Sequence, residues 1–204
     1  MNRSMYEVCD GLLEEACIMW ERDGALLTTS FAIGHSRSLF AQPMSEEGCN
    51  IDNSTRTRIQ ALLASAVGAI YLGRIDESFI SERPADMPPL NKGDLERLAK
   101  TDPSVRTAMV VQATDTRSGE ALVFTATSVL DDEGELGWEL GVFDHAEGQI
   151  IQEAQQSIRL SELITIPSTD VELREELRKL GWALADSDDM GKIHPEPDDE
   201  EDIW

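Results

Sequence analysis

The chain has 204 residues, with 40 acidic residues against 17 lysines and arginines and a formal net charge of −23 at pH 7. Apolar residues make up 41% of the chain, which is enough for a packed core rather than a disordered polyanion. The acidic excess excludes a nucleic-acid-binding protein that works through a basic surface, and no apolar run is long enough to predict a membrane span.

The N-terminal segment predicts an amphipathic helix. Ser4 and Glu7 have the spacing of a capping box, in which each side chain satisfies the free backbone amide of the other residue. Apolar residues then recur every three or four positions, which is the period of one buried helix face. Gly24 is typical of a left-handed helix end, so we expect the helix to cover residues 4–23.

The next segments predict a strand, a loop, a second helix and a second strand. Residues 25–33 are rich in strand formers, whereas the glycines, prolines and polar residues of 34–53 predict a loop. Ser54 is suited to cap a helix, and Gly68 is suited to end it. The apolar residues that follow predict a strand over residues 69–75.

The middle of the chain predicts a short helix and then a meander. Residues 92–100 follow a proline-rich stretch and predict the short helix. Three strands come next, over residues 106–114, 120–130 and 136–144, and their tight connections imply antiparallel pairing. The third strand has apolar residues at alternate positions, which we expect to share one face with Trp138 in the core: Leu136, Trp138, Leu140 and Val142.

The remainder of the chain predicts helices and a tail. Thr169 and Glu172 form a second capping box, and Gly181 ends the helix that follows. We therefore expect an α+β fold: an antiparallel sheet of about five strands with helices packed on it, a helical C-terminal part and a disordered acidic tail. The expected domains are an α+β core over 1–145, a helical extension over 146–185 and the acidic tail over 186–204.

The order of elements in residues 1–145 resembles a loose group of proteins. A helix ends at Gly24 and leads into a strand, a second helix leads into residues 69–72, and an acidic-aromatic step over 76–79 precedes the meander. In order and spacing this layout is similar to small uncharacterised bacterial and phage α+β proteins. The resemblance implies the fold class, and it implies no activity, cofactor or site residue, because that group has no established activity.

Catalytic chemistry has little support in the sequence. The spacing of the histidines matches no metal-binding motif, and neither a glycine-rich phosphate loop nor a GxSxG elbow occurs. Asp115 and Glu120 sit near strand ends, but no lysine lies in a neighbouring predicted strand, which argues against a metal-dependent nuclease. Asp76 and Glu77 are adjacent, so on a strand they point to opposite faces. We expect no cofactor and no metal ion, and the weak candidates for a carboxylate-based site are Asp76, Glu77, Asp144 and His145.

The tail over 186–204 is the unusual segment of the sequence. Its prolines and dense like charge argue against a stable helix. It finishes with a run of acids and two large apolar residues: Asp198, Asp199, Glu200, Glu201, Asp202, Ile203 and Trp204. This end resembles the acidic tips of bacterial and phage single-stranded-DNA-binding proteins, with Trp in place of the usual Phe. The resemblance implies docking on a partner protein, with the apolar side chain in a pocket and the acids guiding the encounter.

These observations predict a non-enzymatic acidic interaction protein of a bacterium or phage, whose partner presents a basic surface. In its specific form, the protein mimics the charge of DNA. One alternative is a replication or repair accessory protein that recruits a partner through the tail, and another is a cryptic carboxylate-based hydrolase. We expect a cytoplasmic location without direct nucleic-acid or membrane binding, because no apolar signal region begins the sequence and its three cysteines form no CxxC pair.

Overall fold

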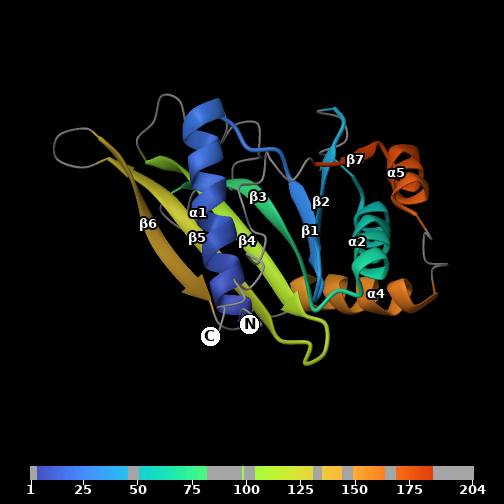
Figure 1. Cartoon of the computed structure of the whole chain (residues 1–204). Helices are drawn as coiled ribbons and strands as arrows, with labels where there is room; N and C mark the ends of the chain where they lie inside the picture. The colour runs from blue at the N-terminus through green and yellow to red at the C-terminus, as the bar shows by residue number, and fades with distance from the viewer. Residues whose placement is uncertain are drawn as a thin grey trace, which may run out of the picture.

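The structure is a computed structural model that describes residues 4–45, 51–81, 98, 104–130, 135–143, 149–163 and 169–185. In chain order the elements are α1 (Met5–Asp23), β1 (Thr29–Ile33), β2 (Ser38–Pro43), α2 (Asn53–Val67), β3 (Tyr71–Ser81), β4 (Val105–Asp115), β5 (Ala121–Leu130), β6 (Leu136–Phe143), α4 (Gln149–Leu163), α5 (Asp170–Lys179) and β7 (Trp182–Leu184). Figure 1 shows one twisted sheet, with α1 lying across β4 and β5 and with the other three described helices gathered near β1, β2 and β7.

The strands form one sheet in the order β6-β5-β4-β3-β1-β2-β7, and every neighbouring pair is antiparallel. The α+β class is therefore confirmed, but the sheet has seven described strands rather than about five. One additional strand, β2, lies in the segment 34–53, which the sequence predicts as a loop. The other, β7, lies in the part predicted as helical. Both are short, and both depend on pairing, since Ala41 of β2 pairs with Ser30 on one side and with Leu184 on the other.

The face of the sheet beneath α1 carries the first of two hydrophobic cores. Consecutive strand residues point to opposite faces, so Phe31 lies on the α1 side and Ala32 on the other side. The apolar face of α1 packs on β3, β4 and β5. Its fully buried members include Cys9 and Leu12, which confirms the predicted amphipathic helix.

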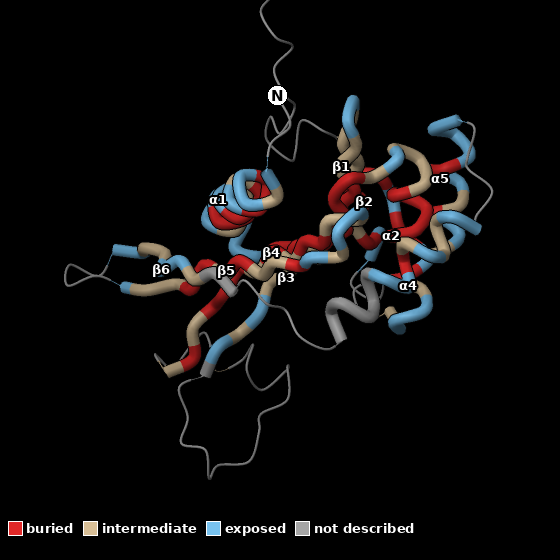
Figure 2. The backbone as a smooth tube through the Cα atoms, turned by 90° about the horizontal axis from the view of Figure 1, so that it is seen from below, coloured by how far each residue is buried: buried red, intermediate tan, exposed pale blue. Residues whose placement is uncertain are grey.

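The opposite face carries the second core under α2 and α5. Trp182 of β7 is 1% exposed and packs in this core with apolar residues of α2 and α5. The helix α4 lies along α2 and is fixed to it by a buried polar contact, because Ser157 Oγ donates to Gln60 Oε1 at 3.0 Å. Gln60 Nε2 in turn donates to the carbonyl oxygen of Gly73 at 3.4 Å. Figure 2 shows the buried stretches of the strands and helices facing one another in these layers.

The predicted helix ends agree closely with the structure where local rules define them. Ser4 and Glu7 form the full capping box, and Gly24 ends α1 in the left-handed conformation with φ 73°. Gly68 ends α2 in the same way with φ 60°. The cap of α2 is Asp52 rather than Ser54, because the Asp52 carboxylate accepts from the Thr55 amide at 2.7 Å.

The meander is confirmed, and the shared apolar face of its last strand is only partly covered. The strands predicted over 106–114, 120–130 and 136–144 are β4, β5 and β6. Leu136, Trp138 and Leu140 of β6 share one face, as predicted, but Leu140 is 66% exposed and Leu136 is 42% exposed. The reason is that β6 is an edge strand, and in it only Trp138 is shown to pack against α1.

Two further predictions concern segments that are described in part or not at all. The strand predicted over 69–75 begins at Tyr71 and continues to Ser81. The short helix predicted over 92–100 lies outside the described residues except for Leu98. The tail over 186–204 also lies outside the described residues.

Candidate functional site

The predicted carboxylate pair in β3 is split by the sheet, as strand alternation predicts. Both oxygens of Glu77 accept hydrogen bonds on the α1 side, from Trp20 Nε1 at 3.1 Å and from the Leu26 amide at 3.0 Å. These bonds fasten the end of α1 and the segment after it to β3. Both oxygens of the Glu77 carboxylate are therefore used in hydrogen bonds that stabilise the fold.

Asp76 lies on the other face of the sheet and belongs to a different environment. Its carboxylate is 2.7 Å from Arg74 Nε, and both side chains are about one-fifth exposed. The remaining members of the predicted group, Asp144 and His145, lie outside the described residues. The structure thus does not bring Asp76 and Glu77 together in one site. Within the described ranges, no group of three or more His, Cys, Asp or Glu residues could hold a metal ion.

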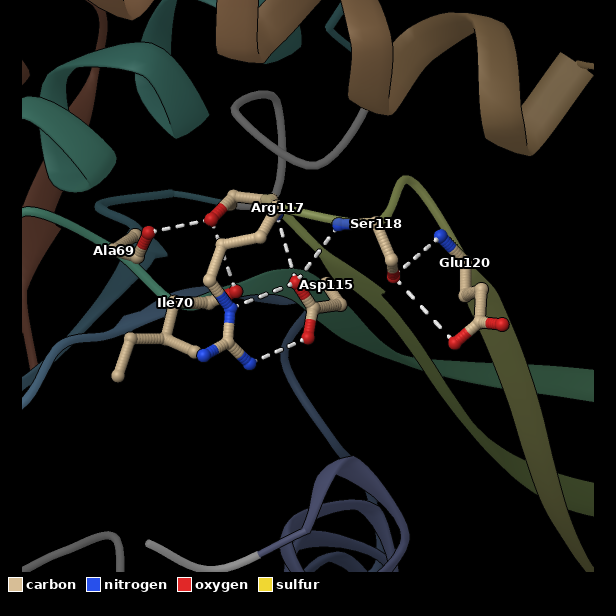
Figure 3. Close-up of polar contacts among 7 residues, drawn as sticks. Ala69, Ile70, Asp115, Arg117, Ser118 and Glu120 are labelled. Atoms are coloured by element: carbon tan, nitrogen blue, oxygen red, sulfur yellow. Dashed lines mark hydrogen bonds and ion pairs between the residues drawn. The ribbon is translucent and has the colours of Figure 1, made fainter.

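The strand-end carboxylate Asp115 also has a structural role, in the turn between β4 and β5 (Figure 3). It accepts from Arg117 Nη2 at 2.7 Å and from the backbone amides of Arg117 and Ser118 at 2.7 and 3.2 Å. Hydrogen bonding from the Arg117 side chain, followed by the two amides, lowers the pKa of Asp115 below its ordinary value. Thr116 Oγ1 donates to the Ala69 carbonyl at 2.7 Å, which fixes the turn to the start of β3.

Of the described helices, α1 carries the largest excess of acidic residues. Residues 5–23 contain six acids against one basic residue, Arg22. Four of the acids recur at spacings of three, four and seven residues, so they lie on one side of the helix. All four are exposed, and they form what we call the α1 acidic stripe: Glu7, Asp10, Glu14 and Glu21.

The members of the α1 acidic stripe differ in what they contact. Glu7 completes the capping box with Ser4, and Glu21 Oε1 accepts from Trp138 Nε1 of β6 at 2.6 Å. Asp10 and Glu14 are different, because no residue in the described part of the chain donates a hydrogen bond to them or forms an ion pair with them. Within the described residues, these two exposed carboxylates of α1 have no counter-ion.

The charges of three of these carboxylates affect two cysteine thiols in the core beneath α1. Burial is the main cause that raises the pKa of Cys9 to about 12, and the charge of Asp10 adds to it. The pKa of Cys17 also rises to about 12, again mainly through burial, with smaller effects from Glu21 and Glu14. Both thiols are therefore protonated and inert near neutral pH.

The helices on the opposite face carry a balanced charge. In α2 the charged residues are two arginines, and α5 has four acids against three basic residues. These charges meet in ion pairs: Arg37 with Asp170 at 2.9 Å, Arg58 with Glu176 at 3.4 Å, and Lys179 with Glu176 at 2.6 Å. The negative potential of the described helices is therefore concentrated on the α1 side.

The sequence alone predicts the partner contact in residues 198–204 and does not single out the α1 acidic stripe. These tail residues all lie outside the described residues. The signal that points to α1 was present in the sequence as acids placed at helical spacing off the apolar face. What the sequence does not show is which acids are left unpaired by the rest of the fold.

Among the helices described, none combines the length and the apolar character that crossing a membrane requires. Comparison of the chain with protein-family models, with curated proteins and with solved structures gave no match. The resemblances of residues 1–145 and 198–204 to known proteins therefore stay predictions. A function for this chain has to be sought in its own residues.

Proposed function

We propose that this protein is a non-enzymatic interaction protein that binds the basic surface of a partner and places carboxylates where that partner otherwise holds the phosphates of DNA. The observation that carries the proposal is the α1 acidic stripe, in which Asp10 and Glu14 have no partner within the described residues. Two unpaired acids four residues apart repel each other on a helix. A cation from outside that lies against the two carboxylates would relieve this repulsion.

The spacing of the carboxylates in the α1 acidic stripe can be compared with the spacing of the charges along DNA. With a rise of about 1.5 Å per residue, Glu7 and Glu21 are about 21 Å apart along the helix axis, and successive carboxylates of the stripe are on average about 7 Å apart. Duplex DNA carries about one charge per 1.7 Å of its axis. The stripe therefore resembles a DNA strand in the sign and the linear arrangement of its charges, but its charge density is lower. Such a charge distribution suits the steering of a basic partner and contact at its surface.

A capture experiment with matched variants tests this function. The immobilised full chain is exposed to bacterial lysate, and retained proteins are eluted with duplex DNA or by raising the salt to about 0.5 M. The test variant carries Asp10→Asn and Glu14→Gln. The control variant carries Glu162→Gln and Glu175→Gln, which remove the same charge from exposed positions on α4 and α5.

We expect the wild-type chain and the control variant to retain proteins that duplex DNA displaces, and the α1 variant to lose most of them. Retention should fall steeply with salt, because exposed charges are screened beyond about 8 Å at physiological ionic strength. Retention that is insensitive to salt, or an equal loss in both variants, would contradict the proposal.

A second candidate function rests on the sequence of the tail. We propose as the alternative that residues 198–204 recruit a replication or repair partner, because a run of acids precedes Ile203 and Trp204. Deleting Ile203 and Trp204 separates the two functions. A loss of capture after this deletion, with the α1 variant still active, would favour the tail, and the reverse result would favour α1.

A further inference from the structure

The strand β6 is the terminal strand of the sheet among the described strands, and within the described residues we find none of the usual protections of such a strand. It pairs with β5 over eight residues, from Leu136 opposite Leu130 to Phe143 opposite Val123. Within the described residues, no strand pairs with its other side. The strand at the far end of the sheet, β7, has three residues. Natural sheets often blunt their edges with short strands, lysines or prolines, and β6 has none of these features.

The side chains beside this edge form an exposed apolar strip on the α1 side of the sheet. Leu136 and Leu140 alternate with Trp138, so the three share one face. Leu130 of β5, directly opposite Leu136, is 70% exposed. Trp138 itself is held by α1, with its ring 5.6 Å from that of Trp20 in an edge-to-face contact. Figures 1 and 2 both show β6 at the outer side of the sheet beside α1.

Acidic residues lie beside this strip on α1 and on the opposite face of β6. On α1, Tyr6 contacts Phe124 of β5 and Glu21 contacts Trp138 of β6, so this flank of the helix is the one that faces the edge. Asp10 lies one helical turn after Tyr6, on the same flank. On the other face of β6, Glu139 is 68% exposed and lies 3.6 Å from Arg106, with glycines two residues before and after it.

We propose that the free edge of β6 is where the basic partner docks, by adding an extended segment in which apolar and basic residues alternate. In such an added strand, residues on one face would meet Leu136 and Leu140, and those on the other would meet Glu139. The flanking glycines leave room for a long basic side chain against Glu139. The acids of α1 guide the approach. This docking site rests on the proposed function and specifies the surface through which the basic partner binds.

The negative charge of the chain argues against a second copy of the chain as the occupant of the β6 edge. Two β6 edges brought together would oppose the Glu139 side chains and bring two acidic α1 helices close, in chains of net charge −23. Like charges opposite each other destabilise strand pairing. The two occupants also differ in their response to salt. Added salt weakens binding of a basic segment and strengthens self-association of an acidic chain.

The probe for this docking is a labelled peptide of alternating valine and lysine, as long as β6, whose anisotropy is followed on adding the full chain. A peptide of the same composition, with its valines and lysines in two blocks, is the peptide control. The test variant is Leu136→Ser with Leu140→Ser. The protein control is Leu163→Ser with Val171→Ser, which removes two apolar side chains that are 81% and 74% exposed on α4 and α5.

We expect the alternating peptide to bind more tightly than the block peptide, and the β6 variant to weaken that binding about tenfold. The protein control should bind as the wild-type chain does. Hydrogen exchange should show new protection of the β6 amides when the alternating peptide is bound, which a purely electrostatic contact would not produce.

Three results would overturn the docking at β6. They are equal binding of both peptides, an equal effect of both protein variants, and self-association that grows with salt. The α1 capture experiment keeps this inference separate from the proposed function. If Asp10→Asn and Glu14→Gln abolish capture while the β6 variant captures normally, the function stands and the docking surface is wrong. If neither variant changes capture, the proposed function itself fails.

Discussion

At the scale of single residues, the two oxygens of Glu77 hold α1 and the segment after it against β3. We expect Glu77→Ala to lower the free energy of unfolding by about 2 kcal/mol, because it leaves Trp20 Nε1 and the Leu26 amide without an acceptor. Glu77→Gln keeps one acceptor oxygen and should lose less. Urea denaturation measures both, with Ser78→Ala on the same strand as the control. A Glu77→Ala chain as stable as the wild type would contradict this role.

The sequence predicts where Glu77 points but not what it does. Alternation along a strand correctly places Asp76 and Glu77 on opposite faces. The donors to Glu77, however, are 57 and 51 residues away in the chain. No local pattern reports contacts over such separations, so a structural carboxylate looks like a candidate catalytic one until the fold is known.

Asp115 gives a prediction on pH. Arg117 and two backbone amides hold the pKa of Asp115 below its ordinary value, so its contribution to stability is complete above the unfolded pKa of about 4 and is lost as the pH falls through the folded pKa. We expect Asp115→Asn to be about 1 kcal/mol less stable than the wild type at neutral pH, and the difference to shrink in acid.

Urea denaturation at neutral and acidic pH measures this difference. Glu175→Gln, at an exposed position of α5, serves as the control and should show no comparable gap at neutral pH. A gap between wild type and Asp115→Asn that widens as the pH falls would show that the carboxylate does not act through its hydrogen bonds to Arg117.

At the scale of elements, the helices are predicted well where both ends carry a signal. For α1, Ser4, Glu7 and Gly24 define the helix almost to the residue. For α2, two neighbouring residues suit the cap, Asp52 and Ser54, and the sequence gives no reason to choose the correct one. The strand β2 was missed because its pairing with β1 and β7, rather than its composition, makes it a strand. Long-range pairing leaves little trace in six residues.

The α1 helix gives a prediction on stability that is opposite to the usual effect of mutation. Asp10 and Glu14 are like charges one turn apart with no partner in the described structure. Replacing them by Asn and Gln should therefore raise stability, by about 0.3 kcal/mol at low salt, and the gain should disappear at high salt. Urea denaturation at two salt concentrations measures it. A loss of about 1 kcal/mol or more would show that the two acids stabilise the fold.

At the scale of the whole molecule, the net charge of −23 opposes the compact state through self-repulsion. We expect the melting temperature to rise by a few degrees when sodium chloride is raised to about 0.5 M. Differential scanning calorimetry measures the shift. The Asp10→Asn and Glu14→Gln variant should gain less from salt than the wild-type chain. A melting temperature that does not depend on salt would mean that ion pairing already balances the charge.

The sequence shows the total charge of the molecule, but it does not show that unpaired acids gather in the α1 acidic stripe. Total charge and its high density in residues 186–204 are visible in the sequence, and they direct attention to the tail. The distribution of unpaired charge over the folded body is not visible, because Arg37 and Arg58 neutralise acids more than a hundred residues away. Only the folded chain shows that ion pairs connect the charges of α2 and α5, whereas Asp10 and Glu14 of α1 have none within the described residues.

The strand β7 has a consequence for how the protein is made. It comes last in the chain among the described strands, yet it pairs with β2, which is formed from residues 38–43. During synthesis on the ribosome, one edge of β2 stays unpaired until β7 has emerged. The apolar residues of α2 likewise lack their contact with Trp182 until that point, when most of the domain has been made. The nascent chain therefore passes through an interval in which the core beneath α1 can be complete while the core under α2 still lacks Trp182, so that its apolar residues are open to a chaperone.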